Sequence, residues 1–241
     1  LDNAVGFLKG LSGIQAVAVL VFHAAEQPTR AQKALSELQT IFQQVAAVVM
    51  EQSKNVHNTS GSVNQKRFED SEYSVDFDEG LAGLLFCELT LRAHLGQAVI
   101  ARSDVVAVAN FLYDQGVRSQ NQTSGEMSFG LDEEGEGVGT SGPLLMLLIY
   151  LQLLPQGAEQ RLRAAVDFYV SQQAADGGMP TDSPGRVQWC HGTPGFIGLF
   201  LKGYQTFNDS KYLQAAEAAA NFTEINGIIL KGNLVGHGAV G

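Results

Sequence analysis

Five Gly-x-x-Gly turns recur along the chain, and they constrain its fold more than any other feature. They read GLSG at 10–13, GLAG at 80–83, GTSG at 139–142, GTPG at 192–195 and GAVG at 238–241. Self-similar segments at such intervals are typical of repeat architectures, in which each repeat is one supersecondary unit. Glycine lets a chain enter a helix sharply and lets neighbouring backbones approach closely. The turns therefore predict repeats that begin near residues 10, 80, 139, 192 and 238.

Each repeat is predicted to contain two kinds of helix. The segments that follow the first four turns are IQAVAVLVFHA, LLFCELTLRAHL, PLLMLLIYLQLL and FIGLFLKGYQTF. They are apolar around most of their circumference, as expected of buried helices. The segments AQKALSELQTIFQQVAAVV, AEQRLRAAVDFYVSQQA and SKYLQAAEAAANF instead show one apolar stripe at helical spacing. In the first of these the stripe consists of Leu35, Leu38, Ile41, Phe42, Val45 and Val48 or Val49. The pattern favours inner, buried helices alternating with outer, amphipathic ones, and an irregular helical bundle is the alternative.

Two polar stretches, 51–76 and 118–136, interrupt this pattern and are expected to be surface loops. If the inner helices stand side by side, their N-termini gather at one end of the fold. The residues just before each turn then surround a common cavity that carries several positive helix-dipole ends. We therefore expect any chemistry to lie there.

Charge and composition exclude several classes of function. The net charge of −10, with scattered lysines and arginines, argues against a nucleic-acid or anionic-membrane surface. The longest apolar run, at 142–155, is shorter than the roughly 20 residues of a membrane helix and indicates a buried helix. Only two cysteines occur, too few for a disulfide framework, so an intracellular, reducing compartment, cytoplasmic or organellar, is expected.

Two motifs resemble those of the LanC-like (lanthionine synthetase C-like) family. They are WCHGTPG at 189–195 and GHG at 236–238, both on the Gly-x-x-Gly repeat, and FLKGLSGIQAVAVLVFHA at 7–24 is similar to the family's second repeat. The resemblance implies an all-α fold, an α/α toroid with a double ring of inner and outer helices. Residues 1–241 would be a single domain that spans repeats two to six of seven and is truncated at both ends.

The resemblance also implies a catalytic zinc ion, which activates a thiol for addition to a dehydrated serine or threonine. Animal homologues are similarly associated with glutathione binding and with thiol addition to dehydroamino acids. Cys190 matches the first zinc ligand and His237 matches the third, but the second ligand position is Gly236. Two donors are fewer than the three protein ligands of ordinary catalytic zinc sites. The position of the family's catalytic histidine is Val138.

Three further positions match functional residues of the family. Asp76 lies four residues before Gly80, Arg186 lies four before Cys190, and His191 occupies a position that the family fills with histidine or tyrosine. Each has a structural alternative. Asp76 could favour a helix N-terminus electrostatically, and Arg186 could form a loop salt bridge.

The two zinc-ligand positions have alternatives of the same kind. Cys190 could be a small buried hydrophobe, and His237 a packing histidine. Cys87 is expected to lie too deep to replace the missing ligand, whereas Glu134 and Glu136 could supply a carboxylate. No cofactor is expected, except zinc if the incomplete site is compensated.

Three functions are compatible with these residues. The first is a LanC-like protein without catalytic activity, kept as a binding or structural subunit of a larger protein assembly. The alternative is a zinc-dependent enzyme that adds cysteine or glutathione to dehydroamino acids. The third is a glycan-active toroid, whose carboxylates would come from Asp76, Asp78, Glu79, Glu134 and Glu136. The acidic surface favours a basic protein partner over nucleic acid or lipid, with 51–76 or 118–136 in the interface.

Overall fold

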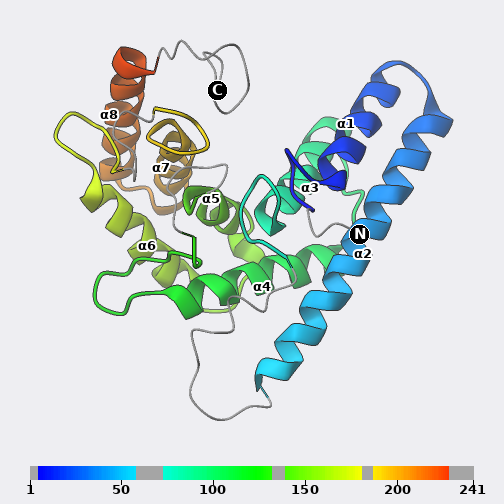
Figure 1. The fold of residues 1–241 in the computed structure, drawn as a ribbon, viewed down its shortest axis with the longest axis horizontal. Coiled ribbons are helices and arrows are strands. Elements are labelled where there is room, and N and C mark those ends of the chain that lie inside the picture. The colour runs from blue at the N-terminus through cyan, green and yellow to red at the C-terminus, as the bar shows by residue number, and fades with distance from the viewer. Residues whose placement is uncertain (1–4, 58–72, 132–138, 181–186, 228–241) are drawn as a thin grey trace. The chain divides into compact units, whose positions relative to one another are not determined.

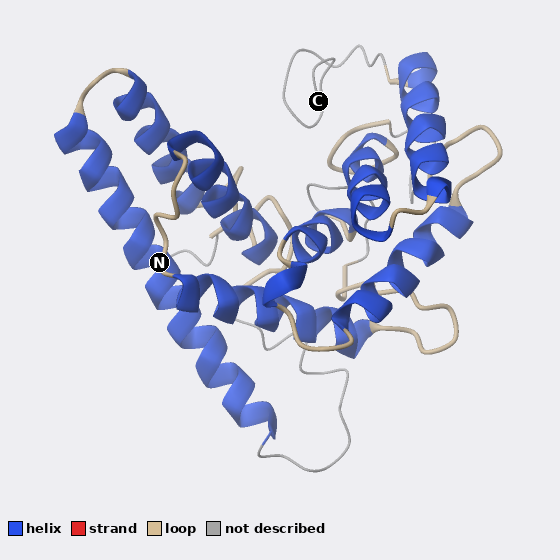
Figure 2. Cartoon of the chain, turned by 180° about the vertical axis from the view of Figure 1, so that it is seen from behind, coloured by secondary structure: helices blue, strands red, loops and turns tan. Residues whose placement is uncertain are grey.

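The computed structural model describes residues 5–57, 73–131, 139–180 and 187–227. These residues form eight α-helices and one short 3-10 helix, and no strand occurs among them (Figures 1 and 2). The predicted all-α class is therefore confirmed. The chain divides into two compact units, Leu1–Gln115 and Gly116–Gly241. Each unit is described by itself.

The first unit contains α1 (Leu11–Ala24), α2 (Pro28–His57), α3 (Leu81–Leu95) and most of α4 (Arg102–Ser119). Helix α1 packs against both α2 and α3, and Figure 1 shows α1 and α2 side by side. The predicted stripe of α2 forms part of the core, because Leu38, Phe42, Val45 and Val49 are fully buried.

The predicted burial is confirmed for α3, whose leucines at 81, 84, 85 and 91 are fully buried. It is wrong for α1, because Ile14, Val17 and Val21 are 63%, 50% and 54% exposed. Helix α1 buries only a narrow face against its neighbours, since its buried residues are Ser12, Gly13, Ala16 and Val19.

The second unit contains α5 (Ser141–Ile149), the 3-10 helix η2 (Leu151–Leu153), α6 (Ala158–Gln172), α7 (Pro194–Phe207) and α8 (Ser210–Asn226). Helix α7 packs against α5, α6 and α8. Its aromatic rings Phe196 and Phe200 are fully buried, and so are Tyr169 of α6 and Tyr212 of α8. Pro194 occupies the first turn of α7, where its missing N–H costs no helical hydrogen bond.

The structure corrects several local predictions. Residues 51–57 continue α2, so the polar stretch that starts at residue 51 is helical at its beginning. Helix α4 was not predicted from its own residues. The apolar run 142–155 is no single helix, because the α-helix ends at Ile149 and a 3-10 turn follows.

The second polar stretch, 118–136, is more than a surface loop in the part that the structure describes. Met127 and Phe129 are buried, at 0% and 2% exposure. The hydroxyl of Tyr169 donates a hydrogen bond to the carbonyl of Met127 over 3.2 Å. Two apolar anchors within a polar sequence therefore hold this segment on the second unit.

Glycine is required in the repeated turns for a steric reason. A Cβ atom at Gly13 would collide with the carbonyl oxygen of Phe7, and one at Gly83 would collide with that of Phe77. Because these obstacles are backbone atoms, a rotamer change cannot remove them. The second glycine of the turns before α1 and α3 thus lets each helix start lie directly on the segment that precedes it.

Candidate functional site

The turn that carries Cys190 leads directly into α7 in the second unit. Its backbone is closed by hydrogen bonds from His191 N to Gln188 O, at 3.3 Å, and from Gly195 N to Gly192 O, at 3.0 Å. The hydroxyl oxygen of Thr193, which is buried, accepts a hydrogen bond from the backbone N–H of Met179 over 2.9 Å. This turn is therefore a well-anchored helix entry.

Cys190 is the most buried of the described site residues. It is 1% exposed, whereas the neighbouring His191 is half-buried. The two residues are consecutive in the sequence. Cys190 lies four positions, and His191 three positions, before Pro194, where α7 begins. A thiol near a helix N-terminus is in a position where the helix dipole favours the thiolate. A small buried hydrophobe at a helix entry would have the same burial.

Asp76 lies in the turn before α3, in the first unit, and its described contacts are structural. Its Oδ1 accepts the backbone N–H of Glu79 over 2.7 Å, and its Oδ2 accepts the hydroxyl of Ser74. The residue is 8% exposed. A carboxylate that accepts backbone and hydroxyl donors of its own turn fixes that turn. A catalytic role of Asp76 stays a prediction.

The turns before α1 and α3 are bonded to each other in the first unit. The N–H groups of Val5 and Gly6 both donate to Glu79 O, each at 2.7 Å. The N–H groups of Leu8 and Lys9 donate to Asp78 O, at 3.2 and 3.0 Å. Residues about 70 positions apart in sequence are thereby joined through their backbones, and the two repeats begin side by side.

The turns of both units share a longer pattern than Gly-x-x-Gly, which the sequence reading missed. It is a valine, an aromatic residue two positions later, and glycines five and eight positions after the valine. It occurs at 5–13, at 75–83 and at 187–195. In this register Asp78 occupies the position of Cys190, and Lys9 and Glu79 occupy that of His191. Alignment of the three segments would have distinguished Asp78 from the other candidate carboxylates, because it alone occupies the position of Cys190.

The remaining predicted site residues lie outside the part of the chain that the structure describes. They are Arg186, Gly236 and His237, together with Val138 and the two glutamates, Glu134 and Glu136. Within the described ranges, no group of three His, Cys, Asp or Glu side chains could hold a metal ion. Because His237 lies outside the described residues, this finding does not test the predicted zinc site.

Cys87 is unsuited to replace a zinc ligand. It is fully buried in α3, and burial raises the pKa of its thiol to about 12. A metal-bound cysteine must be a thiolate. At neutral pH the Cys87 side chain is therefore a protonated, apolar core group.

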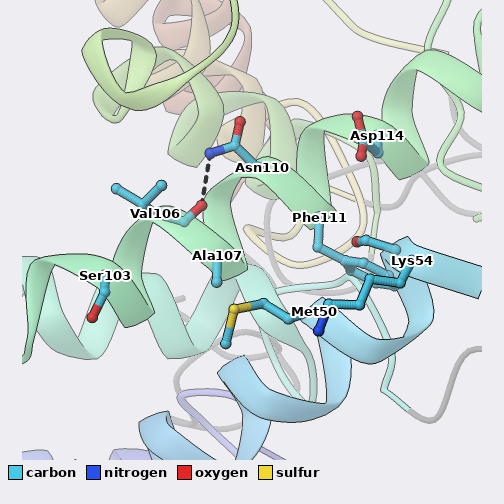
Figure 3. A pocket seen from close by; sticks show the side chains of 9 residues that line it. Met50, Lys54, Ser103, Val106, Ala107, Asn110, Phe111 and Asp114 are labelled. Carbon is cyan, nitrogen blue, oxygen red and sulfur yellow. Dashed lines mark hydrogen bonds between the residues drawn. The ribbon is translucent and has the colours of Figure 1, made fainter. Parts of the chain in front are cut away.

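A cavity of about 350 Å³ lies between α2 and α4 in the first unit (Figure 3). Its lining is formed by Met50, Ser53, Lys54, Ser103, Val106, Ala107, Asn110, Phe111 and Asp114. Met50 is 46% exposed, whereas Phe111 is buried at 3%. The groove thus combines an apolar floor with a polar rim that includes one lysine and one aspartate. On its α2 side, Ser53 and Lys54 belong to the stretch 51–76, which is predicted to take part in an interface, and Met50 directly precedes that stretch.

None of the helices in the described ranges is both long enough and apolar enough to cross a bilayer. This agrees with the expectation for the apolar run at 142–155.

A comparison with protein families now identifies the chain. The family model described as lanthionine synthetase C-like protein matches residues 2–241. The match covers all the repeated turns and both the WCHGTPG and the GHG motif, and it agrees with the all-helical fold. The chain therefore belongs to the lanthionine synthetase C-like family.

Proposed function

We propose that this chain is a LanC-like protein without zinc-dependent thiol chemistry, and that it works as a binding or structural subunit of a larger protein assembly. One observation carries the proposal: Gly236 stands where the family resemblance implies a cysteine ligand. Glycine has no side-chain donor. Cys190 and His237 then provide two donors, and catalytic zinc sites ordinarily use three. The residues at these positions do not fit a catalytic zinc ion.

A second substitution supports the same proposal. Val138 occupies the position of the family's catalytic histidine. A positioned acid or base contributes about 10²–10⁴ in rate, and the valine side chain cannot transfer a proton. The chain has thus lost both a metal donor and a proton-transfer group.

The alternative is a zinc-dependent enzyme that adds a thiol, from cysteine or glutathione, to dehydroamino acids. Cys190 supports it, because this cysteine matches the family's first zinc ligand in the sequence and lies four residues before α7. The missing donor would then have to come from another residue, for which Glu134 and Glu136 are the sequence candidates. A carboxylate is an accepted zinc ligand.

Zinc analysis of the purified full chain distinguishes the two functions. We expect much less than about one zinc ion per chain, the content of a structural or catalytic site, and no change in Cys190→Ala. A stoichiometric zinc content that Cys190→Ala abolishes and Cys87→Ala leaves intact would establish the alternative. Thioether formation between glutathione and a dehydroalanine peptide is the matching activity assay.

The groove between α2 and α4 is the surface that we assign to a partner protein. Met50 exposes nearly half of a large apolar side chain at its edge, and a partner that covered this side chain would remove its apolar surface from water. We propose that a partner places an apolar side chain against Met50 and Phe111. The net charge of this chain is −10, which favours a partner with basic groups.

A further inference from the structure

Asp78 is a buried charged residue that neither the proposed function nor its zinc-dependent alternative uses. It lies in the turn before α3 and is 5% exposed. Its backbone carbonyl accepts the N–H groups of Leu8 and Lys9 from the turn before α1. Asp78 is therefore part of the junction that joins the starts of the two repeats.

The carboxylate of Asp78 is incompletely satisfied. Its Oδ1 is buried and makes no hydrogen bond to the described residues. Its Oδ2 lies 3.6 Å from Nζ of Lys9, and this ammonium group is closer to Glu79, at 3.1 Å. An ionised carboxylate in such a place loses hydration without full compensation by hydrogen bonds.

The charges around Asp78 do not offset this loss. Asp76 and Glu79 in its own turn are carboxylates, and Lys9 in the facing turn is the one cation among the groups that act on it. Burial is the largest cause that raises the pKa of Asp78, the two carboxylates raise it further, and Lys9 lowers it in part. The protonated form is thus favoured more in the folded chain than in the unfolded one.

We infer that Asp78 makes this junction a pH-sensitive latch, which tightens when the carboxyl group takes up a proton and loosens when the group ionises. Protonation removes the buried negative charge and leaves Lys9 paired with Glu79. The backbone ladder from Val5, Gly6, Phe7, Leu8 and Lys9 to the facing turn is the element that opens and closes.

The direction of the pH effect follows from linkage. A group whose pKa is raised by folding contributes stability at acidic pH, and this contribution is lost as the pH rises through its folded-state pKa. The pKa of an aspartate in an unfolded chain is about 3.9. The pH range over which this stability is lost therefore lies above that value. The latch is therefore tighter in mild acid than at neutral pH.

Amide hydrogen exchange of residues 5–9 in the full chain tests the inference. After correction for the intrinsic pH dependence of exchange, we expect protection to rise several-fold between about pH 7 and pH 4, and by at most about tenfold per pH unit for one proton. Asp78→Asn, which is neutral at every pH, should abolish this rise. Glu37→Gln, an exposed carboxylate on α2 of the same unit, should keep it.

A second variant separates titration from a packing effect. Lys9→Met removes the one compensating cation, so the midpoint of the rise should move to higher pH. The inference is wrong if protection of residues 5–9 does not change with pH, if Asp78→Asn keeps the rise, or if Lys9→Met leaves the midpoint in place.

Discussion

The phenol group of Tyr212 on α8 donates a hydrogen bond to Oδ1 of Asp167 on α6, over 2.5 Å. The tyrosine is fully buried, and its burial raises the pKa of the phenol, which keeps the proton on it. Asp167 is also paired with Lys211, whose Nζ lies 2.7 Å from the same carboxylate oxygen. This bond ties the outer helices of two successive repeats together within the second unit.

Removal of that hydrogen bond should destabilise the protein without creating a cavity. We expect Tyr212→Phe to lower the free energy of unfolding by about 1 kcal/mol, because the bond is charge-assisted but Asp167 stays partly solvated. Urea unfolding measures this. Tyr204→Phe on α7 is the control, since no hydrogen bond of the Tyr204 hydroxyl is described. Equal losses in both variants would show that the Tyr212–Asp167 bond does not contribute to stability.

The second glycine of the repeated turn should be intolerant of any side chain. Gly83→Ala places a methyl group against the backbone of Phe77 and Phe7, and we expect a loss of at least about 2 kcal/mol. Gly96→Ala is the matched control at the other end of α3. Gly96 has a φ of +69° with open space around it, so only a left-handed strain of about 1 kcal/mol applies. Thermal unfolding should rank the two variants in that order, and the reverse order would refute the steric explanation.

Asp209 should give the second unit a pH dependence opposite to that of Asp78. It caps α8, and its pKa is lowered, first by the backbone N–H of Lys211 and then by the charges of Lys211 and Arg163. A lowered pKa means stability that is present above the unfolded value and lost as the pH falls through the folded one. Asp209→Asn keeps the cap but removes the charge. Its unfolding free energy should lie below that of the natural chain at neutral pH and converge with it in acid.

The groove between α2 and α4 can be tested through the native assembly. Met50→Gln should shift the chain to a smaller size in size-exclusion chromatography of its native extract, with unchanged thermal stability, because Met50 is 46% exposed. Leu201→Gln on α7 alters a residue of similar exposure, 40%, and should leave the size unchanged. A natural chain that elutes as a monomer and forms glutathione adducts would exclude the proposed subunit role.

Restoration of the two lost groups should create zinc binding. We expect the double variant Gly236→Cys, Val138→His to bind about one zinc ion per chain. The new cysteine joins Cys190 and His237, which gives the three protein donors of an ordinary catalytic zinc site. Isothermal titration with zinc measures this, and Cys190→Ala in the same background should abolish it. The prediction is wrong if the natural chain binds zinc as tightly as the restored one.

Local periodicity explains which parts of the fold were predictable. The amphipathic stripe of α2 and the apolar helix α7 appear as patterns within a few helical turns, and the structure confirms both. The missed features depend on partners distant in sequence. The Met127 carbonyl accepts the hydroxyl of the distant Tyr169, and the ring of Phe129 and the sulfur of Met127 lie against Gly116 of α4. Nothing in a polar stretch marks these two residues as buried.

The sequence by itself determined the helical repeat, its glycine turns, the family, and the absence of a side-chain donor at Gly236. These follow from residue identity and short-range spacing, which need no tertiary contact. Only the tertiary structure decided that Asp76 fixes its own turn and that the Asp78 carboxylate is buried beside Lys9. Burial and electrostatic environment are set by backbone segments about 70 residues apart that pair through N–H···O=C bonds. Such bonds carry no side-chain signature, because every residue except proline supplies the same donor and acceptor.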